Sequence, residues 1–312
     1  MRHLSECCLR LGAASASLAS VEWPPCAPAL IVASSSRLAS RFAASGVPRM
    51  PDSVGTRDGG SRIPVTADTR LLVLTGAGVS AESGLATFRG SDGLWENEPV
   101  EEVATPRGFA HDSERVWRFY SARRAAADSA RPNAAHLALA DVERRLGDRF
   151  LLATQNVDGL HRAAGSERVI ELHGSLWRTR CSRCQRASFP DRRYPVEPPL
   201  PVCDVCAEEG RPPAYLRPAI VWFEEMLNPD DQDRVMRFLQ SAAADHAPLH
   251  FLAAGTSGTV YPAASYVRYA KAVGATTWLA NLDRPENARA FDHVVEGPAT
   301  AVVQHLLGVA PG

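Results

Sequence analysis

Short runs of consecutive apolar residues recur along the chain from about residue 70 onward. They are LLVLT (71–75), FLLAT (150–154), RVIEL (168–172), LHFLAAG (249–255), TTWLA (276–280) and HVVEG (293–297). Strands that are buried on both faces, as in parallel sheets, read as continuous apolar runs of this kind. Stretches with helical periodicity lie between several of these runs, at 134–146, 231–243 and 263–272. The alternation predicts an α/β fold with a doubly wound parallel sheet, a Rossmann-like large domain.

Two segments interrupt this alternation, and we expect them to form a second, smaller domain. The first, at about 93–130, is helical, and the second, at about 176–215, is rich in Cys, Pro and Arg. The large domain then comprises about 63–92, 131–175 and 216–312. Insertions into a doubly wound core predict a cleft between the two domains.

Residues 1–62 are rich in Ala, Ser, Arg and Pro, and no apolar period persists there. A secretory signal is disfavoured because the apolar run near Leu30 is short and far from Met1. A mitochondrial transit peptide fits the Arg-rich, acid-poor composition. The bias toward Ala and Arg, with Lys271 the single lysine, is typical of a high-GC bacterial genome. We therefore favour a disordered or spurious extension before a start at Met50, which predicts a cytoplasmic protein; the transit-peptide reading predicts a mitochondrial one.

The overall composition excludes two classes of partner. The formal net charge of −1 lacks the basic excess that electrostatic nucleic-acid binding needs. No apolar run reaches the roughly 18–20 residues of a membrane-spanning helix. We expect neither nucleic acid nor membrane as a partner, and we expect a monomer.

Four of the seven cysteines form two CxxC pairs, Cys181 with Cys184 and Cys203 with Cys206. This spacing is typical of a zinc ribbon, in which each pair aims two thiolates at one ion. Four thiolates leave no open coordination position, so we predict one structural Zn²⁺. The odd cysteine count and the metal spacing argue for a reducing compartment and against a disulfide framework.

A glycine-rich turn, GAGVSAESG (76–84), directly follows the run LLVLT. Such turns let the backbone approach a pyrophosphate at a helix N-terminus. The spacing differs from GxGxxG because the third glycine comes late, so the turn alone is equally consistent with a plain strand–helix loop.

Several longer motifs make the sequence recognisable. GAGVSAESGLATFRG (76–90), TQNVDGLH (154–161), ELHGS (171–175), the CxxC pairs and GTSGTVYPAA (255–264) occur in this order. Over residues 68–312 the chain resembles the sirtuin family of zinc-containing, NAD-dependent protein-lysine deacylases.

The resemblance implies a catalytic residue and an NAD site. ELHGS resembles the family's catalytic motif, which makes His173 the general base; a neutral imidazole can accept a proton from a ribose hydroxyl. The motifs imply NAD contacts for Gly76, Ala77, Gly78, Ser80, Glu82, Ser83, Phe88, Arg89, Trp95, Gln155, Asn156, Val157, Asp158, Gly255, Thr256, Ser257, Asn281, Leu282, Asp283 and Ala299.

The resemblance also implies the reaction. The acyl oxygen of a modified lysine attacks C1′ of the nicotinamide ribose, and nicotinamide leaves. The final products are free lysine and 2′-O-acyl-ADP-ribose, so NAD is a consumed co-substrate and acylated-lysine proteins are the partners. A plain deacetylase, a mono-ADP-ribosyltransferase and a non-enzymatic NAD- or peptide-binding module remain as alternatives.

Two residues bear on the acyl group. Tyr120 and Arg123 are neighbours on one helix face, where a phenol and a guanidinium together can hold a carboxylate. Their placement, with Thr87, resembles class III, the succinyl- and malonyl-preferring branch. The alternative is a surface helix with ordinary arginines, since Arg118 and Arg124 flank the pair.

The substrate strand, RPAIVWFEE (217–225), departs from its usual form in this branch, RPHVVWFGE. The resemblance assigns substrate contacts to Val221, Phe223 and Glu225. Ala219 replaces a histidine and Glu224 replaces a glycine. Family peptides bind by strand addition, which a side chain on Glu224 could crowd or simply flank.

Overall fold

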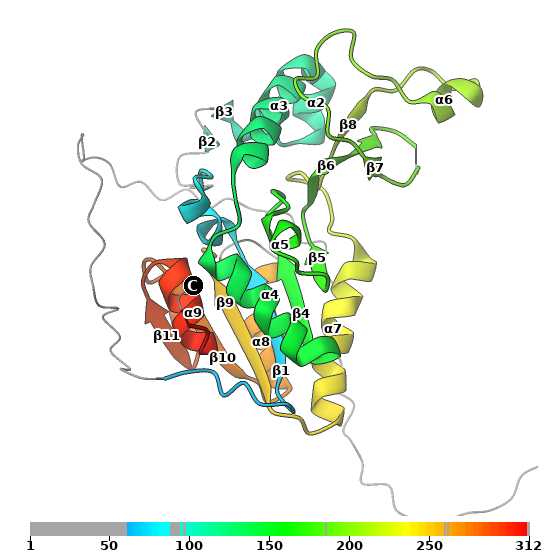
Figure 1. Ribbon diagram of the computed structural model, residues 1–312. Coiled ribbons are helices and arrows are strands. Elements are labelled where there is room, and N and C mark those ends of the chain that lie inside the picture. The colour runs from blue at the N-terminus through cyan, green and yellow to red at the C-terminus, as the bar shows by residue number, and fades with distance from the viewer. Residues whose placement is uncertain are drawn as a thin grey trace, which may run out of the picture.

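A computed structural model describes most of the chain (Figure 1). The residues it describes are 61–87, 94–95, 98–184, 186–258, 260 and 262–310. The predicted N-terminal extension lies outside this part except for its last two residues. Phe88 and Arg89, two of the predicted NAD contacts, also lie outside the described residues.

Six parallel strands form the large sheet. They are β1 (Arg70–Thr75), β4 (Phe150–Thr154), β5 (Val169–Glu171), β9 (Leu249–Ala254), β10 (Thr276–Asn281) and β11 (His293–Glu296). Their order across the sheet is β11-β10-β9-β1-β4-β5, and all neighbouring pairs are parallel. If these six strands are numbered 1 to 6 in chain order and the sheet is read from its β5 edge, the order is 3-2-1-4-5-6, that of a doubly wound fold. The predicted fold class is confirmed.

Helices cover both faces of this sheet, which is why its strands are apolar throughout. Successive residues of a strand point to opposite faces. In β1, Leu71 and Val73 pack in the core on one face, whereas Leu72 and Leu74 pack in the core on the other. The covering helices are α4 (Ala134–Leu146) and α9 (Ala299–Leu307) on the first face, and α7 (Pro229–Ala244) and α8 (Tyr266–Ala272) on the second.

Capping residues set where the long helices begin. Asn133 caps α4 through its side-chain oxygen, in a reciprocal capping box with the third helical residue. Asn228 caps α7, and Pro229 follows at the first helical position. This cap explains why α7 begins two residues before the predicted span of 231–243. None of the described helices combines the length and apolar character that crossing a bilayer requires.

The smaller domain combines helices with an antiparallel sheet of order β7-β6-β8. Figure 1 shows it beyond one end of the large sheet. Its elements are β2 (Leu94–Trp95), β3 (Glu98–Pro99), α1 (Val100–Val103), α2 (Pro106–His111), α3 (Ser113–Ser129), β6 (Gly174–Cys181), β7 (Phe189–Pro190), α6 (Asp204–Glu208) and β8 (Leu216–Ile220). Short elements elsewhere are η1 (Ala77–Val79), η2 (Ala81–Ser83), η3 (Gly147–Arg149), α5 (Leu160–Ala163), η4 (Ala263–Ser265) and η5 (Glu286–Ala290).

Strand β8 pairs with a strand of the smaller sheet, although it follows the segment predicted to form the small domain. The segment predicted for it ended near residue 215, which left β8 in the large domain. In the structure β8 pairs with β6, and no residue of β8 joins the large sheet. The difference arises because an antiparallel partner is chosen by tertiary contacts, whereas an apolar run alone does not identify its sheet.

Arg124 joins α3 to this sheet from a fully buried position. Its guanidinium donates to the backbone carbonyls of Leu176 and Arg193 at 2.7 and 2.8 Å, and to Thr179 Oγ1 at 3.1 Å. It also lies 3.6 Å from the buried carboxylate of Asp191. A buried guanidinium with several partners fixes α3 against this sheet, because separating the two would leave the charge desolvated without compensation.

Candidate active site

A cavity of about 990 Å³ lies where the two domains meet. Its large-domain lining includes residues that follow strands, among them Ala77 after β1, Gln155 after β4 and Gly255 after β9. Its small-domain lining includes Tyr120 and Arg123 of α3. A doubly wound sheet binds ligands at the carboxyl ends of its strands, at the point where strand order reverses. Here that point lies between β1 and β9, and the cavity opens there.

The turns after β1 and β9 touch each other through backbone atoms. A Cβ on Gly76 would lie 2.7 Å from the carbonyl oxygen of Gly255, and one on Gly78 would lie 2.8 Å from its Cα. Gly255 itself has φ of 59°, and a Cβ there would lie 2.4 Å from the amide of Val79. These glycines therefore let two crossover turns meet at the floor of the cavity. Gly78 and Gly255 line the cavity, whereas Gly76 lies behind it.

A polar cluster is buried behind the turn after β1. Ser80 Oγ donates to Asp158 Oδ2 at 2.8 Å and accepts from Asn156 Nδ2 at 3.1 Å. Asp158 Oδ1 accepts from the backbone amide of Leu160 at 2.8 Å. Burial raises the pKa of Asp158, and these hydrogen bonds oppose that shift. The cluster orients the amide of Asn156, which lines the cavity together with Ser80 and Asp158.

His173 also lines the cavity, between the end of β5 and the start of β6. Its Nδ1 lies 3.1 Å from the carbonyl oxygen of Gln155. A carbonyl can only accept, so Nδ1 carries the proton and Nε2 presents a lone pair. Nε2 is buried and has no hydrogen-bond partner in the described part of the chain. Burial lowers the pKa of His173 to about 4, so the ring is neutral near pH 7.

The cavity is also lined by Glu82, by Asn281 and its two successors, and by Ala299. The Glu82 carboxylate accepts from the amide and hydroxyl of Thr300 at 2.9 and 2.6 Å, which ties the turn after β1 to the start of α9. Asn281 Nδ2 donates to the carbonyl of Asp283 at 2.9 Å, which shapes the turn after β10.

Most residues predicted to contact NAD line this one cavity. They are Ala77, Gly78, Ser80, Glu82, Trp95, Gln155, Asn156, Val157, Asp158, Gly255, Thr256, Ser257, Asn281, Leu282, Asp283 and Ala299. Of the described ones, Gly76 and Ser83 lie outside the lining, and Ser83 Oγ accepts from Asn133 Nδ2 at 3.0 Å.

Tyr120 and Arg123 line the small-domain wall of the cavity, and Thr87 is also among its lining residues. The Arg123 guanidinium carbon lies 5.0 Å from the ring centroid of Phe119 and 5.9 Å from that of Trp95. Burial lowers the pKa of Arg123 to about 10, which leaves it charged near pH 7. Burial raises the pKa of Tyr120, which keeps the phenol protonated.

Trp222 forms a hydrogen bond with the Tyr120 hydroxyl. The sequence analysis did not identify Trp222 as a site residue. Its indole Nε1 donates to the Tyr120 oxygen at 2.9 Å, and the Arg217 guanidinium carbon lies 3.8 Å from its ring centroid. Trp222 also lines the cavity. Its position inside RPAIVWFEE was visible in the sequence, but nothing in the motif pointed to a partner about a hundred residues away.

The predicted substrate contacts divide into two groups. Val221 and Phe223 line the cavity, and the Val221 amide donates to the carbonyl of His173 at 2.8 Å. Glu225 does not line it. Its carboxylate accepts from Arg217 Nη2 at 2.9 and 2.8 Å and from the Trp222 amide at 2.9 Å. Glu225 therefore supports the wall from behind.

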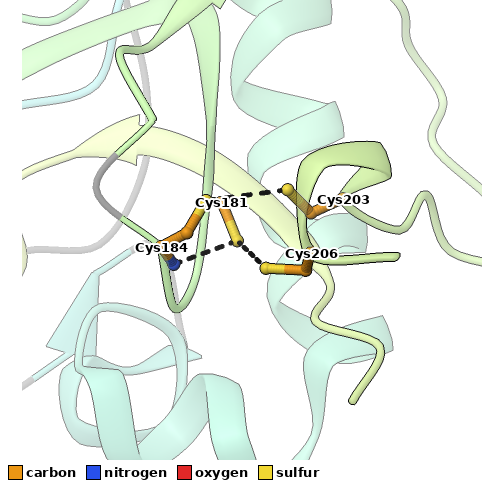
Figure 2. A group of neighbouring side chains, drawn as sticks. All are labelled: Cys181, Cys184, Cys203 and Cys206. Carbon is orange, nitrogen blue, oxygen red and sulfur yellow. Dashed lines mark hydrogen bonds between the residues drawn. The ribbon is translucent and has the colours of Figure 1, made fainter. Parts of the chain in front are cut away.

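The four predicted metal ligands come together at one point in the small domain (Figure 2). Their Sγ atoms all lie within 4.8 Å of one another. Cys181 and Cys206 are separated by 3.8 Å, and Cys184 and Cys203 by 3.7 Å. A tetrahedral zinc with bonds of about 2.3 Å places its sulfurs about 3.8 Å apart. The quartet fits zinc, and none of the four lines the cavity.

Comparison with known proteins finds relatives of the whole core. The model described as "Sir2 family" matches residues 76–262. An NAD-dependent protein deacylase of Pasteurella multocida (strain Pm70) is 44% identical over 245 residues, which covers 78% of this chain and 98% of the relative. A crystal structure of a Sir2 homologue–NAD complex aligns with a TM-score of 0.68 and 42% identity, over 81% of this chain and 96% of that one. A mutant Sir2 homologue in complex with 2′-O-acetyl-ADP-ribose aligns with a TM-score of 0.67 and 45% identity, over 77% and 91%.

Proposed function

The chain belongs to the Sir2 family, from which we infer that it is an NAD-dependent protein deacylase, and we propose that its acyl pocket favours succinyl and malonyl groups. The observation that carries this preference is the pair Tyr120 and Arg123 in one wall of the cavity. NAD is a co-substrate of the reaction, and zinc, held by the four cysteines, has a structural role.

We assign the two ends of the cavity to the two ends of NAD. The end beside Glu82, Asn281 and Ala299 would take the adenosine half. The end beside Asn156 and His173 would take nicotinamide and its ribose. A fixed carboxamide at Asn156 can recognise the nicotinamide amide, because Ser80 and Asp158 hold its orientation. The turns at the switch point between β1 and β9 let the backbone approach the pyrophosphate.

His173 is the general base in this proposal. Its Nε2 lone pair faces no protein donor in the described part of the chain, and it can accept a proton from a ribose hydroxyl. The bond from Nδ1 to the Gln155 carbonyl strengthens as the ring becomes positive, which favours that transfer. With one water molecule consumed to release the lysine, the products are nicotinamide, free lysine and 2′-O-acyl-ADP-ribose.

The acyl carboxylate would be bound by Tyr120 and Arg123 together. Arg123 remains charged, since its pKa of about 10 lies well above neutral. The Tyr120 oxygen already accepts from Trp222, so its own proton is the group left to donate to an incoming carboxylate. The wall thus presents one charged donor and one neutral donor. An acetyl group has no carboxylate to accept from either donor, so the wall discriminates against it.

The test compares Arg123→Met with the wild type on matched succinyl-, malonyl- and acetyl-lysine peptides. Loss of the guanidinium leaves a carboxylate partly desolvated with no charge partner, which costs about 2–5 kcal/mol. We expect desuccinylation to fall at least about 30-fold, mainly through KM, and deacetylation to change little. Mass detection of the acyl-ADP-ribose product identifies the reaction.

Arg118→Met on the same helix is the matched control, because Arg118 is exposed and does not line the cavity. It should leave both activities near wild type. Equal losses on succinyl and acetyl peptides in the Arg123 variant would make the pair structural, and the enzyme would then be a general deacetylase. An ADP-ribosylated protein in place of free acyl-ADP-ribose would support the transferase alternative.

A further inference from the structure

The segment that follows β4 is bound by the small domain as well as by the large one. Val157 and Asp158 line the cavity, and the carbonyl of each accepts a hydrogen bond from β6. The Leu176 amide donates to the Val157 carbonyl at 2.9 Å, and the Trp177 indole Nε1 donates to the Asp158 carbonyl at 2.7 Å. Any residue type except proline can supply the first bond, whereas the second depends on the side chain at position 177.

Trp177 completes the set of hydrogen bonds that fixes Asp158. The Asp158 carboxylate accepts from the Ser80 hydroxyl and from the Leu160 amide, both in the large domain. With the carbonyl bound by Trp177, all three oxygens of Asp158 have a donor. Asp158 is 9% exposed. Removing a donor from so buried a residue therefore costs more than an exposed hydrogen bond would contribute.

Gly159 leaves the space that the indole ring occupies. Its φ is 82°, a conformation that glycine adopts readily, and a Cβ there would lie 2.8 Å from Trp177 Nε1 and 2.9 Å from Cδ1. Gly165, which follows α5, also has a positive φ of 97°, yet a Cβ there would meet nothing within 4 Å. The missing side chain at position 159 therefore serves the ring contact as well as the turn.

The small domain holds the ring of Trp177 in place. The Asp191 amide donates to the Trp177 carbonyl at 2.9 Å, and the Arg192 guanidinium carbon lies 4.7 Å from the ring centroid. The ring packs against the apolar core of the small domain. Trp177 is half-buried and does not line the cavity, so its direct hydrogen bond to a cavity residue is the one to Asp158.

We propose that Trp177 is a positioning residue for NAD, which makes the small-domain sheet a part of the cofactor site. The inference rests on the proposed function, because it needs nicotinamide and its ribose beside Asn156 and Asp158. By holding the Asp158 carbonyl, the indole fixes the backbone of the segment that carries these two residues. A ligand binds more tightly where its contacts are fixed before it arrives.

The test replaces Trp177 with Phe, which removes the N–H donor and keeps an aromatic ring. Calorimetry in the absence of peptide measures NAD affinity without turnover. We expect the Kd of NAD to rise about 2- to 12-fold, the range for one neutral hydrogen bond. KM for NAD should rise with it, whereas KM for the acyl peptide should stay near the wild-type value.

Trp117→Phe is the matched control. The Trp117 indole donates to the Leu216 carbonyl at 3.0 Å in the same domain, and Trp117 does not line the cavity. This variant should lower thermal stability and leave NAD affinity near wild type. Gly159→Ala should weaken NAD binding by displacing the ring, whereas Gly165→Ala, with similar backbone strain and no ring contact, should not.

The outcomes separate the two levels of the argument. Equal NAD affinity in the wild type and in Trp177→Phe, or equal losses in the Trp177 and Trp117 variants, overturns the role of Trp177. A wild type that binds NAD but releases no acyl-ADP-ribose from any peptide contradicts the proposed function, and the affinity comparison still tests Trp177. A wild type that binds no NAD overturns both.

Discussion

At the scale of single residues, one backbone contact determines the chemistry available to His173. The Gln155 carbonyl accepts from Nδ1, so the lone pair lies on Nε2. Burial then lowers the pKa and keeps that lone pair free of a proton. Tautomer and protonation state both suit a residue that accepts protons from a sugar hydroxyl.

This environment predicts the pH dependence of kcat/KM. The general base works in its neutral form, which persists as pH falls until it reaches the lowered pKa of about 4. We therefore expect the acid limb of kcat/KM to lie well below pH 6.5, the ordinary value for histidine. In His173→Ala, activity should fall about 10²–10⁴-fold with NAD binding retained. An acid limb centred at or above 6.5 contradicts the assignment.

Trp222 gives a second prediction at this scale. Trp222→Phe removes the N–H donor to Tyr120 and keeps an aromatic ring. A neutral hydrogen bond contributes about 0.5–1.5 kcal/mol, so desuccinylation should fall by about 2- to 12-fold relative to deacetylation. KM and kcat are measured on matched succinyl and acetyl peptides. An equal fall on both would mean that Trp222 fills space without orienting the hydroxyl.

At the scale of elements, the cysteine quartet joins the end of β6 to the start of α6. The segment between them has little regular structure, with β7 contributing two residues. Few apolar residues pack there, mainly Leu216 and Ala214 beside the cysteines. Metal coordination therefore supplies much of the stability of this part of the small domain.

We expect one Zn²⁺ per chain in purified protein, and Cys181→Ser should lose the ion. The small-domain sheet should then become more exposed to hydrogen exchange, whereas β1 and β9 keep their protection, because the large-domain cores contain none of the four cysteines. Metal analysis measures the zinc content of the wild type and the variant, and hydrogen exchange measures the change in protection of each sheet. A folded protein without zinc contradicts the assignment.

At the scale of the whole molecule, the first described residues pack against the last helix. The Ile63 side chain is buried in the core beneath α9, and its amide donates to the carbonyl of Leu306 at 2.8 Å. The chain therefore joins the large domain before β1, and a truncated chain must retain Ile63 to keep this contact.

We predict different results for two truncations. A chain that begins at residue 61 keeps Ile63 and should retain activity and unfolding free energy. A chain that begins at residue 66, or the full chain with Ile63→Ala, should lose about 2–5 kcal/mol, the usual effect of removing a large buried aliphatic side chain. Denaturant unfolding measures both. If the first truncation were as damaging as the second, residues before 61 would belong to the fold.

Several features of this protein followed from the sequence because they depend on local physics. Strands covered on both faces are apolar at every position, so β4 could be located from FLLAT alone. Paired CxxC turns bring their thiolates together over short loops, so the quartet was predictable. The glycines after β1 were visible as well, although their contact with Gly255 was not.

What only the tertiary structure decided are the contacts between distant segments. Trp222 meets Tyr120 because β8 pairs with β6 and leads its chain beneath α3. Glu225 lies outside the cavity lining because its carboxylate is bound by Arg217 of β8, eight residues earlier in the chain. The sequence by itself determined the fold class and the zinc ligands, since these depend on periodicity and spacing, whereas the motif residues followed from the resemblance to the sirtuin family. The walls of the pocket depend on how two domains pack, and side-chain partners across that interface are set by geometry that no local pattern encodes.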